Sequence, residues 1–301
     1  MVEFRHILAT TDMSDSSGPA LAYASAFASG YGAHLALLHV VPTFDAIQMP
    51  PGTLGDAVQM VYPSSREEVI ATMQRQVESA GLPAASLYLM AEAGDPVETI
   101  VDQAISIPAD LIVMGTHGRS GFNRMLFGSV TEHVLHRSPC PVLTVPPHSA
   151  VAPADAWFKR ILCAMDFSPA AMQALGFALE LGRQSRGLVI VQHAIEWLPD
   201  EEPRVHAHFN VAEYRTYLLE DARARLDAVL SAEDRARVDV QPIVAAGRAY
   251  REILKEAEAR GADLIVMGAQ GRGGLGQALT GSATNQVLRA ATCPVLTVRA
   301  A

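Results

Sequence analysis

The stretch Ala109-Asp-Leu-Ile-Val-Met-Gly115 occurs a second time as Ala262-Asp-Leu-Ile-Val-Met-Gly268, an offset of 153 positions from 109 to 262. Cys140-Pro-Val-Leu-Thr-Val145 returns at the same offset, as Cys293-Pro-Val-Leu-Thr-Val298. Ile7-Leu-Ala-Thr-Thr-Asp12 corresponds to Ile161-Leu-Cys-Ala-Met-Asp166 at an offset of 154, one residue more, from 7 to 161. Such self-similarity at a fixed period indicates a duplicated domain. A single domain with internal pseudo-symmetry is the alternative, but two copies of equal length and ordinary domain size favour duplication.

The duplication places one domain at residues 1–147 and the other at 156–301, separated by the Pro/Ala-rich stretch 146–155. In the first copy, short apolar runs predict strands that alternate with segments of helical spacing. This order is typical of βαβ units with right-handed crossovers. We therefore expect an α/β protein with two tandem, doubly wound, open parallel sheets. The expected strands are 4–9, 34–41, 86–91, 111–114 and 142–145; the expected helices are 19–30, 66–80, 96–107 and 130–137.

Composition excludes several classes of function. The 301 residues carry a net charge of −9 and no run of lysine or arginine, so nucleic-acid binding and docking on an anionic membrane are not expected. No signal peptide and no membrane-spanning stretch is visible. Three cysteines without metal-like spacing indicate reduced thiols. We expect a cytoplasmic protein.

The candidate chemistry follows the fourth expected strand of each copy. The first copy reads Gly115-Thr-His-Gly118 and then Gly128-Ser129, and the second reads Gly268-Ala-Gln-Gly271 and then Gly281-Ser282, a G-x-x-G-x9-G-S pattern in both. Glycines let the backbone approach an anion, and a helix that begins at the Gly-Ser pair offers free N–H groups to phosphate. The hydroxyls of Ser129, Thr131, Ser282 and Thr284 and the side chains of Arg119 and Arg272 are further expected donors.

Two simpler interpretations remain open. Glycines after a strand often form only turns, and Ser129-Val-Thr-Glu132 fits a capping box. The second copy argues against the capping box, because Asn285 replaces the glutamate while Gly281-Ser282 remains. Two copies of the pattern, each between an apolar strand and a helix, favour a phosphate loop.

On these residues both halves resemble universal stress protein domains of the ATP-binding branch, and the whole chain resembles tandem members of that family. The motifs are the opening aspartate, the histidine after the second strand, Ala93-Gly-Asp-Pro96, the glycine loop and the Cys-Pro-Val-Leu-Thr-Val strand. The resemblance implies a Rossmann-like, adenine nucleotide α-hydrolase-like fold that binds ATP, ADP or AMP, with or without Mg²⁺. It implies a first site formed by Thr11, Asp12, Val40, Met114, Gly115, His117, Gly118, Arg119, Gly128, Ser129, Val130 and Thr131. It implies a second site formed by Met165, Asp166, Ala194, Met267, Gly268, Gln270, Gly271, Arg272, Gly281, Ser282, Ala283 and Thr284.

The second copy departs from the first where Ala194 replaces a valine and Gln270 replaces a histidine, and Gln277 lies near the position of Arg124. Fewer basic side chains then face its phosphates, so we expect the second site to be the weaker.

Other candidates have structural explanations. Asp12 and Asp166 could be helix N-caps, and His39 and His193 lie at the ends of apolar strands, where packed, hydrogen-bonded side chains are usual. Cys140 and Cys293 are expected to pack as small apolar groups. His206-Ala-His208, near Glu201 and Glu202, could seed a zinc site, but two histidines without a clear third ligand are usually loop residues.

The chain lacks a P-loop lysine and any obvious catalytic triad, so we expect no enzyme and at most slow, incidental ATP hydrolysis. The function expected is a nucleotide-responsive stress regulator with an unknown protein partner. The alternatives are a slow ATPase and an interaction module whose apolar insert, 42–63, contacts a protein or lipid. By the resemblance, domains pair through strands 142–145 and 295–298, as a homodimer or as an intramolecular pseudo-dimer.

Overall fold

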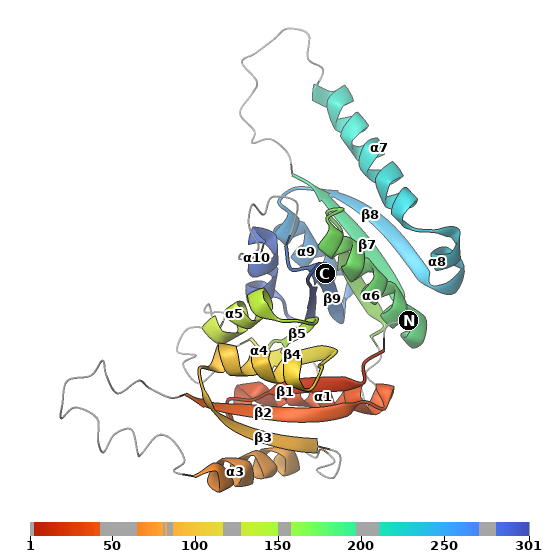
Figure 1. Cartoon of the computed structure of the whole chain (residues 1–301). Helices are drawn as coiled ribbons and strands as arrows, with labels where there is room; N and C mark the ends of the chain where they lie inside the picture. Colours follow the sequence, from red (N-terminus) through yellow and green to blue (C-terminus); the bar gives the residue numbers. More distant parts are fainter. Residues whose placement is uncertain are drawn as a thin grey trace, which may run out of the picture. The chain divides into compact units, whose positions relative to one another are not determined.

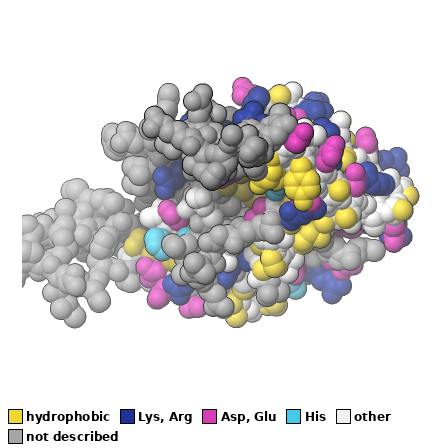
Figure 2. Space-filling model, turned by 90° about the horizontal axis from the view of Figure 1, so that it is seen from above, with side chains coloured by type: hydrophobic (Ala, Val, Ile, Leu, Met, Phe, Trp, Pro, Cys, Tyr) yellow, Lys and Arg dark blue, Asp and Glu magenta, His cyan; other side chains and the backbone are white. Residues whose placement is uncertain are grey.

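The computed structural model describes residues 3–42, 65–80, 82, 87–116, 128–149, 158–196, 211–270 and 281–300. The chain divides into two compact units, one spanning Glu3–Ala156 and the other including Trp157–Ala301. Both units alternate strands with helices (Figure 1). On the face seen in Figure 2, acidic and basic side chains are interspersed over the described surface.

The first unit is a five-stranded parallel sheet in the order β3-β2-β1-β4-β5. Its strands are β1 His6–Thr10, β2 His34–Pro42, β3 Leu87–Gly94, β4 Leu111–Gly115 and β5 Val142–Val145. Its helices are η1 Asp15–Ser17, α1 Gly18–Tyr31, α3 Arg66–Ser79, α4 Pro96–Ser106 and α5 Ser129–Arg137.

The strand order reverses direction at β1, because β2 and β3 lie on one side of it and β4 and β5 on the other. Right-handed crossovers then place α1 and α3 on one face of the sheet and α4 and α5 on the other. The connections after β1 and β4 leave toward opposite faces. The carboxyl ends of these two strands are thus the switch point at which open α/β sheets bind ligands.

The second unit repeats this topology in the order β8-β7-β6-β9-β10. Its strands are β6 Arg160–Ala164, β7 Leu188–Ile195, β8 Asp239–Ala246, β9 Leu264–Gly268 and β10 Val295–Val298. Its helices are α6 Pro169–Ser185, α7 Val211–Val229, α8 Ala232–Arg237, α9 Ala249–Arg260 and α10 Ser282–Ala290. The predicted fold class, two tandem doubly wound parallel sheets, is confirmed.

The central strands form the core. β4 is buried from Leu111 to Met114, and Ile7 of β1, which pairs with Leu111, is completely inaccessible to solvent. Strands covered on both faces read as continuous apolar runs, which explains why Leu-Ile-Val-Met is the stretch that both copies retain.

The aspartate that precedes this run joins the two central strands at their amino ends. Oδ2 of Asp110 accepts hydrogen bonds from the backbone N–H groups of Arg5 and His6 at 2.7 and 2.9 Å. Asp263 accepts equivalent bonds from Lys159 and Arg160 at 2.7 and 3.0 Å. The repeated Ala-Asp therefore has a structural role in both domains.

Element boundaries differ from the prediction by a few residues. The helix expected to end at Gly30 continues to Tyr31, because Gly32, with φ of 63°, supplies the left-handed cap. β3 extends three residues beyond Ala91, since it pairs with β2 along the whole length of that longer strand. α4 buries Ile100, Val101 and Ala104 against the sheet.

We predict that Asp110→Ala lowers the unfolding free energy by about 1–2 kcal/mol, because it leaves two backbone N–H groups without their acceptor. Urea denaturation followed by circular dichroism measures this change. Asp102→Ala, an exposed aspartate on α4, is the matched control and should cause no loss. Equal losses in the two variants would contradict the role given to Asp110.

Candidate functional site

A sharp turn after β1 fixes Asp12 at the carboxyl edge of the first sheet. Met13 has φ of 61°, in the left-handed region. Oδ1 of Asp12 accepts hydrogen bonds from the N–H and the hydroxyl of Ser14, at 3.0 and 2.6 Å. The hydroxyl oxygen of Thr11 accepts the N–H of Met13 at 2.9 Å. The carboxylate is thus held in one orientation.

Neither opening aspartate caps a helix. Ser14 and Ser17 hold the N-cap positions of η1 and α1, and Ser168 caps α6, so the interpretation of Asp12 and Asp166 as N-caps is wrong. The second carboxylate oxygen of Asp12, Oδ2, is buried and has no hydrogen-bond partner. A buried carboxylate oxygen without a donor costs free energy. This atom is therefore an acceptor available to a ligand.

His39 holds the backbone of the same turn. Its Nδ1 donates to the carbonyl oxygen of Thr11 at 2.7 Å, and the residue is 5% exposed. His193 makes the same bond to the carbonyl of Met165, also at 2.7 Å. The prediction that both histidines are packed, hydrogen-bonded structural residues is confirmed.

Helix α5 begins at the same edge. Its N-cap is Gly128, and the first intrahelical bond runs from the N–H of Glu132 to the Gly128 carbonyl at 3.0 Å. Helix geometry leaves the three preceding N–H groups, those of Ser129, Val130 and Thr131, without intrahelical acceptors. These groups and the positive end of the helix dipole favour an anion.

The capping-box interpretation of Ser129 and Glu132 is wrong. Ser129 occupies the first helical position, after the Gly128 cap, and no side-chain cap bond forms. The Ser129 residue is exposed, so its hydroxyl can contact a ligand bound at the helix terminus.

The two threonines of this motif have a different role from the one predicted. The hydroxyl of Thr131 donates to the carbonyl of Gly115 at 3.0 Å, and that of Thr284 donates to Gly268 at 3.0 Å. A hydroxyl has one proton to donate, so the expectation that these threonines donate to phosphate is wrong. Each instead ties the start of a helix to the end of the central strand.

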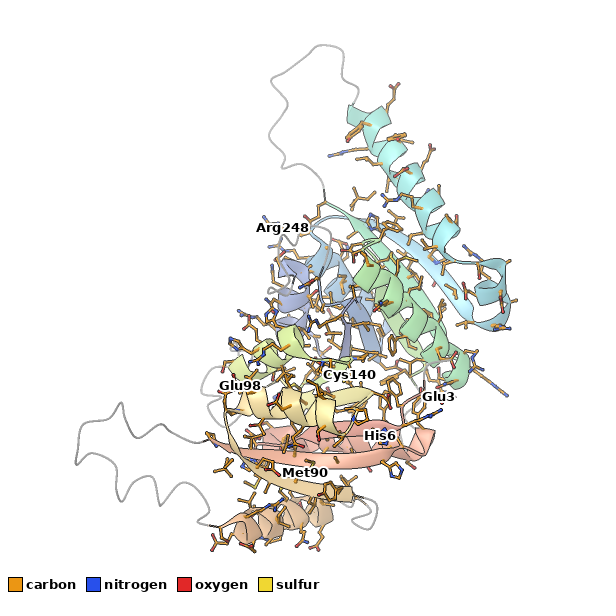
Figure 3. All side chains as sticks on the ribbon, viewed as in Figure 1. Glu3, His6, Met90, Glu98, Cys140 and Arg248 are labelled. Atoms are coloured by element: carbon orange, nitrogen blue, oxygen red, sulfur yellow. The ribbon has the colours of Figure 1, made fainter. Side chains whose placement is uncertain are left out.

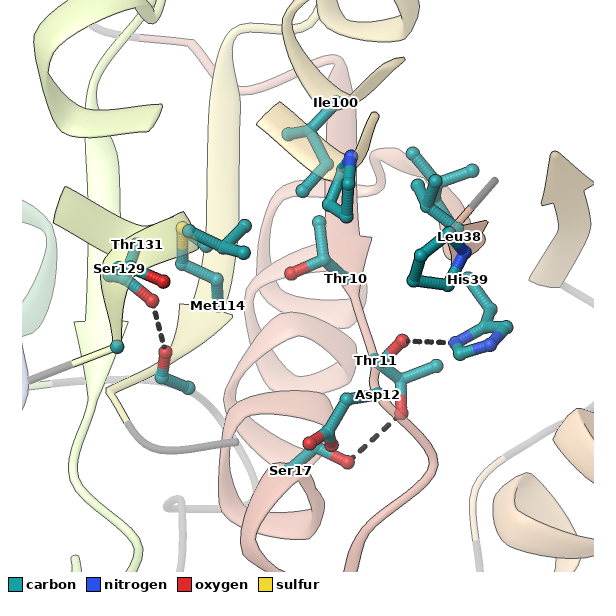
Figure 4. A pocket seen from close by; sticks show the side chains of 16 residues that line it. Thr10, Thr11, Asp12, Ser17, Leu38, His39, Ile100, Met114, Ser129 and Thr131 are labelled. Atoms are coloured by element: carbon teal, nitrogen blue, oxygen red, sulfur yellow. Dashed lines mark hydrogen bonds between the residues drawn. The ribbon is translucent and has the colours of Figure 1, made fainter. Parts of the chain in front are cut away.

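These parts surround a pocket with a volume of about 360 Å³ (Figure 4), which lies within the size range of small-molecule sites. Leu38, Val40, Ile100 and Met114 belong to its apolar wall. Polar groups gather at the ends of β1 and the start of α5. The lining residues are Thr10, Thr11, Asp12, Ser17, Leu38, His39, Val40, Pro42, Pro96, Ile100, Met114, Gly115, Gly128, Ser129, Val130 and Thr131.

The described members of the first predicted set all line this pocket. They are Thr11, Asp12, Val40, Met114, Gly115, Gly128, Ser129, Val130 and Thr131. His117, Gly118 and Arg119 lie outside the described residues.

The pocket has further lining residues outside the predicted set: Thr10, Ser17, Leu38, Pro42, Pro96 and Ile100. Pro96 ends the Ala-Gly-Asp-Pro motif, which was the available signal for it. The others required knowledge of which strand ends and helix faces meet.

The second domain has the same framework. Phe167 has φ of 62°, and Oδ1 of Asp166 accepts the N–H of Ser168 at 2.9 Å, so the turn after β6 matches that after β1. Gly281 is the N-cap of α10, with Ser282 at the first helical position. The described members of the second predicted set lie on the turn after β6, on β7, on β9 and just after it, and at the start of α10: Met165, Asp166, Ala194, Met267, Gly268, Gln270, Gly281, Ser282, Ala283 and Thr284. Gly271 and Arg272 lie outside the described residues.

The two domains brace the turn differently. In the first, the side-chain amide of Gln76 on α3 accepts the Thr11 hydroxyl at 2.9 Å and donates to Ser17 at 3.0 Å. In the second, the guanidinium of Arg225 on α7 lies 4.1 Å from the centre of the Phe167 ring. The centres of the Phe167 and His193 rings are 4.7 Å apart. Arg225 thus replaces a hydrogen-bond network with a cation–π contact.

The charge beside the site also changes between domains. Asp95 caps α4 by accepting the N–H groups of Val97 and Glu98, at 3.0 Å each. Arg248 holds the N-cap position of α9 (Figure 3) and makes no side-chain cap bond. Glu196 instead accepts the N–H of the following residue, Ala249, at 3.1 Å.

The cysteines are not reactive thiolates. Burial raises the pKa of Cys140 to about 11 and that of Cys163 and Cys293 to about 12. Thiols with such pKa values are protonated near neutral pH and pack as small apolar groups, as predicted for Cys140 and Cys293.

Among the described residues, no three His, Cys, Asp or Glu side chains gather in a way that could hold a metal ion. The residues suggested as a zinc site, Glu201, Glu202, His206 and His208, fall outside the described part of the chain. The described helices include none that is long and apolar enough to cross a membrane.

The sequence model of the universal stress protein family matches residues 3–146 and again 158–299. The chain belongs to the universal stress protein family. The two matches confirm the tandem architecture that the repeats indicate.

Relatives extend over both domains of this universal stress protein. One from Mycobacterium tuberculosis is 28% identical over 275 residues, covering 88% of this chain and 87% of that protein. Another, from Mycolicibacterium smegmatis, is 27% identical over 296 residues, covering 97% of this chain and 96% of that protein. The crystal structure of a universal stress protein from Archaeoglobus fulgidus matches with a TM-score of 0.68 and 23% identity, covering 100% and 98% of the two chains. That likeness shows the shared fold.

We predict that Thr131→Val lowers the unfolding free energy of the first domain by about 1–2 kcal/mol. The carbonyl oxygen of Gly115 then loses its donor at a buried position, since Thr131 is 4% exposed. The control is Thr72→Val, which removes a hydroxyl bond within α3 at a more exposed position. Chemical denaturation that gives both variants the same midpoint would show that the bond to Gly115 contributes nothing specific.

Proposed function

We propose that this universal stress protein binds ATP or a related adenine nucleotide and acts as a nucleotide-responsive regulator in the stress response. The observation that carries the proposal is one pocket in which an apolar wall, an unpaired carboxylate oxygen and a free helix N-terminus meet. These three features match, in turn, a flat aromatic base, a sugar hydroxyl that donates a hydrogen bond, and a phosphate chain.

The base is assigned to the apolar wall. Val40, Ile100 and Met114 come from β2, α4 and β4, so they enclose the pocket from three elements. A ring that enters this space removes apolar surface from water, which stabilises the complex by about 25 cal/mol for each Å² buried.

The phosphates are assigned to the start of α5. The N–H groups of Ser129, Val130 and Thr131 and the Ser129 hydroxyl are the donors there. Mg²⁺, if bound, is held through the nucleotide phosphates in this proposal, since the described residues offer no three-ligand cluster. ADP and AMP fit the same donors with fewer phosphates.

Asp12 is assigned to a donor on the nucleoside. Its Oδ2 accepts a hydrogen bond from a ribose hydroxyl, and this bond compensates the desolvation of the carboxylate.

The proposal is binding rather than turnover. Asp12 and His39 are the titratable side chains among the lining residues, and His39 is engaged with the backbone through Nδ1. We therefore expect hydrolysis to be slow and incidental. A cytoplasmic location fits protonated, unpaired cysteines. Pairing through strands 142–145 and 295–298 stays a prediction.

The first test is mass spectrometry of the nucleotide released when the purified chain is denatured, followed by calorimetric titration with ATP, ADP, AMP and cyclic AMP. Cyclic AMP is included because one universal stress protein structure contains it. Asp12→Asn retains the acceptor for Ser14 but removes the free carboxylate oxygen. We predict that this variant binds ATP about 10–100-fold more weakly, since bonds to charged groups contribute about 1.5–3 kcal/mol.

Asp102→Asn, on the exposed face of α4, is the charge-matched control and should bind as the unmodified chain does. If the folded chain releases no nucleotide and gives no heat with any of the four ligands, with or without magnesium, the proposal fails. Rapid release of phosphate from ATP would replace the proposed binding protein with an ATPase.

A further inference from the structure

The second domain places a buried amide where the first has an apolar wall. Leu38 lines the first pocket, and Gln192 holds the same register position in β7, since His6 pairs with His34 as Arg160 pairs with Leu188. Gln192 is 2% exposed. A long polar side chain is rarely buried to this extent without a partner for each of its polar atoms.

Only half of this amide is satisfied. The Nε2 group of Gln192 donates to the carbonyl oxygen of Glu252, in the first turns of α9, at 3.0 Å. Oε1 is buried and has no hydrogen-bond partner. The bond to Glu252 fixes which end of the amide is the acceptor, so the free atom of Gln192 can accept a hydrogen bond but cannot donate one.

The neighbouring positions are smaller in the second domain. Ala194 stands in place of Val40, and Ala249 in place of Pro96. Ile253 and Met267 keep the positions of Ile100 and Met114. The positions of the wall assigned to the base are thus retained, with smaller side chains at two of them and with one hydrogen-bond acceptor added.

We propose that the second domain binds a nucleotide with an amino-bearing purine, whose exocyclic amine donates a hydrogen bond to Oε1 of Gln192. The chain then carries two nucleotide sites of different selectivity, one reading the base by shape and one by its amine. This inference rests on the proposed function, because it assigns the base to the wall that contains Leu38 and Gln192.

The chemistry of the purine limits the choice. The amine at position 6 of adenine and the amine at position 2 of guanine are both donors, and an acceptor oxygen serves either. A site built around a buried acceptor discriminates against a ligand that lacks the donor, because the acceptor then stays unpaired. Loss of the amine is the variable to test.

The experiment uses the full chain with Asp12→Asn, because this substitution weakens nucleotide binding at the first site. Calorimetry then measures the affinity of this chain for two matched pairs of ligands. ATP is compared with purine riboside triphosphate, and GTP with inosine triphosphate; the members of each pair differ in the exocyclic amine. We expect the amine to strengthen binding about tenfold in one pair, which identifies the base. The chain with Asp166→Asn, which alters the turn after β6 in the second domain, reports the first site. Its affinities for the two ligands of the same pair should differ by less than about threefold.

Gln192→Leu installs the side chain that the first domain has at this position, and it should reduce the tenfold discrimination to nearly one. Gln192→Met is the second variant if the leucine chain does not fold. Gln184→Leu is the matched control: Gln184, near the end of α6, also has a buried, unpaired Oε1 and an Nε2 that donates, to Glu180 at 3.0 Å. It should leave the discrimination at tenfold.

Equal affinity for both members of each pair, or discrimination that survives Gln192→Leu, overturns the inference. So does a second domain that binds no nucleotide while the first domain binds ATP; in that case the proposed function stands. If neither domain binds any nucleotide, both proposals fail.

Discussion

The site depends on the reversal of strand order at β1. Because the chain leaves β1 toward one face of the sheet and leaves β4 toward the other, nothing in the sheet covers the carboxyl ends of these neighbouring strands. In the described part of the chain, the turn that carries Asp12 and the start of α5 reach this edge. Their polar groups therefore meet a wall built from core strands, and a rigid scaffold holds each of them in place.

The duplicated domains separate framework from lining. The bonds that hold this framework occur twice: histidine to the turn carbonyl and threonine to the strand-end carbonyl at the carboxyl edge, and aspartate to two backbone N–H groups at the amino ends of the strands. The side chains that face the cavity are not kept in this way, since Leu38 corresponds to Gln192 and Val40 to Ala194. A fold held by backbone contacts leaves its lining residues free to change, and so one framework can serve two ligand specificities.

The sequence predicted the fold because its information was periodic: a repeat, apolar strands and glycine-marked ends. It predicted the lining only where glycine spacing or the family resemblance marked a residue. The direction of a hydrogen bond could not be predicted from the sequence. The pattern indicates a Thr131 hydroxyl that donates to a ligand, but this hydroxyl donates to the carbonyl oxygen of Gly115. The role of Gln192 could not be predicted from its place in an apolar strand. It depends on the register of β7 with β6 and on the hydrogen bond that its amide donates to Glu252 on α9. Only the geometry of the turn shows that Asp12 accepts a hydrogen bond within that turn and does not cap the start of a helix.

The bond between Asp110 and the N–H of Arg5 also sets a time scale for synthesis, because the two residues are 105 positions apart. β1 leaves the ribosome early, pairs with β2, and then waits with its other edge open until β4 has been made. At a translation rate of about 5–20 residues per second this interval lasts about 5–20 s. An unpaired edge of a strand whose centre is apolar, as Ile7, Leu8 and Ala9 make it, is a template for aggregation during that time. The second domain repeats the interval, since Asp263 closes the same contact with Lys159 at a similar separation. The order of the strands along the chain therefore determines how long this edge of each central strand stays unpaired during synthesis.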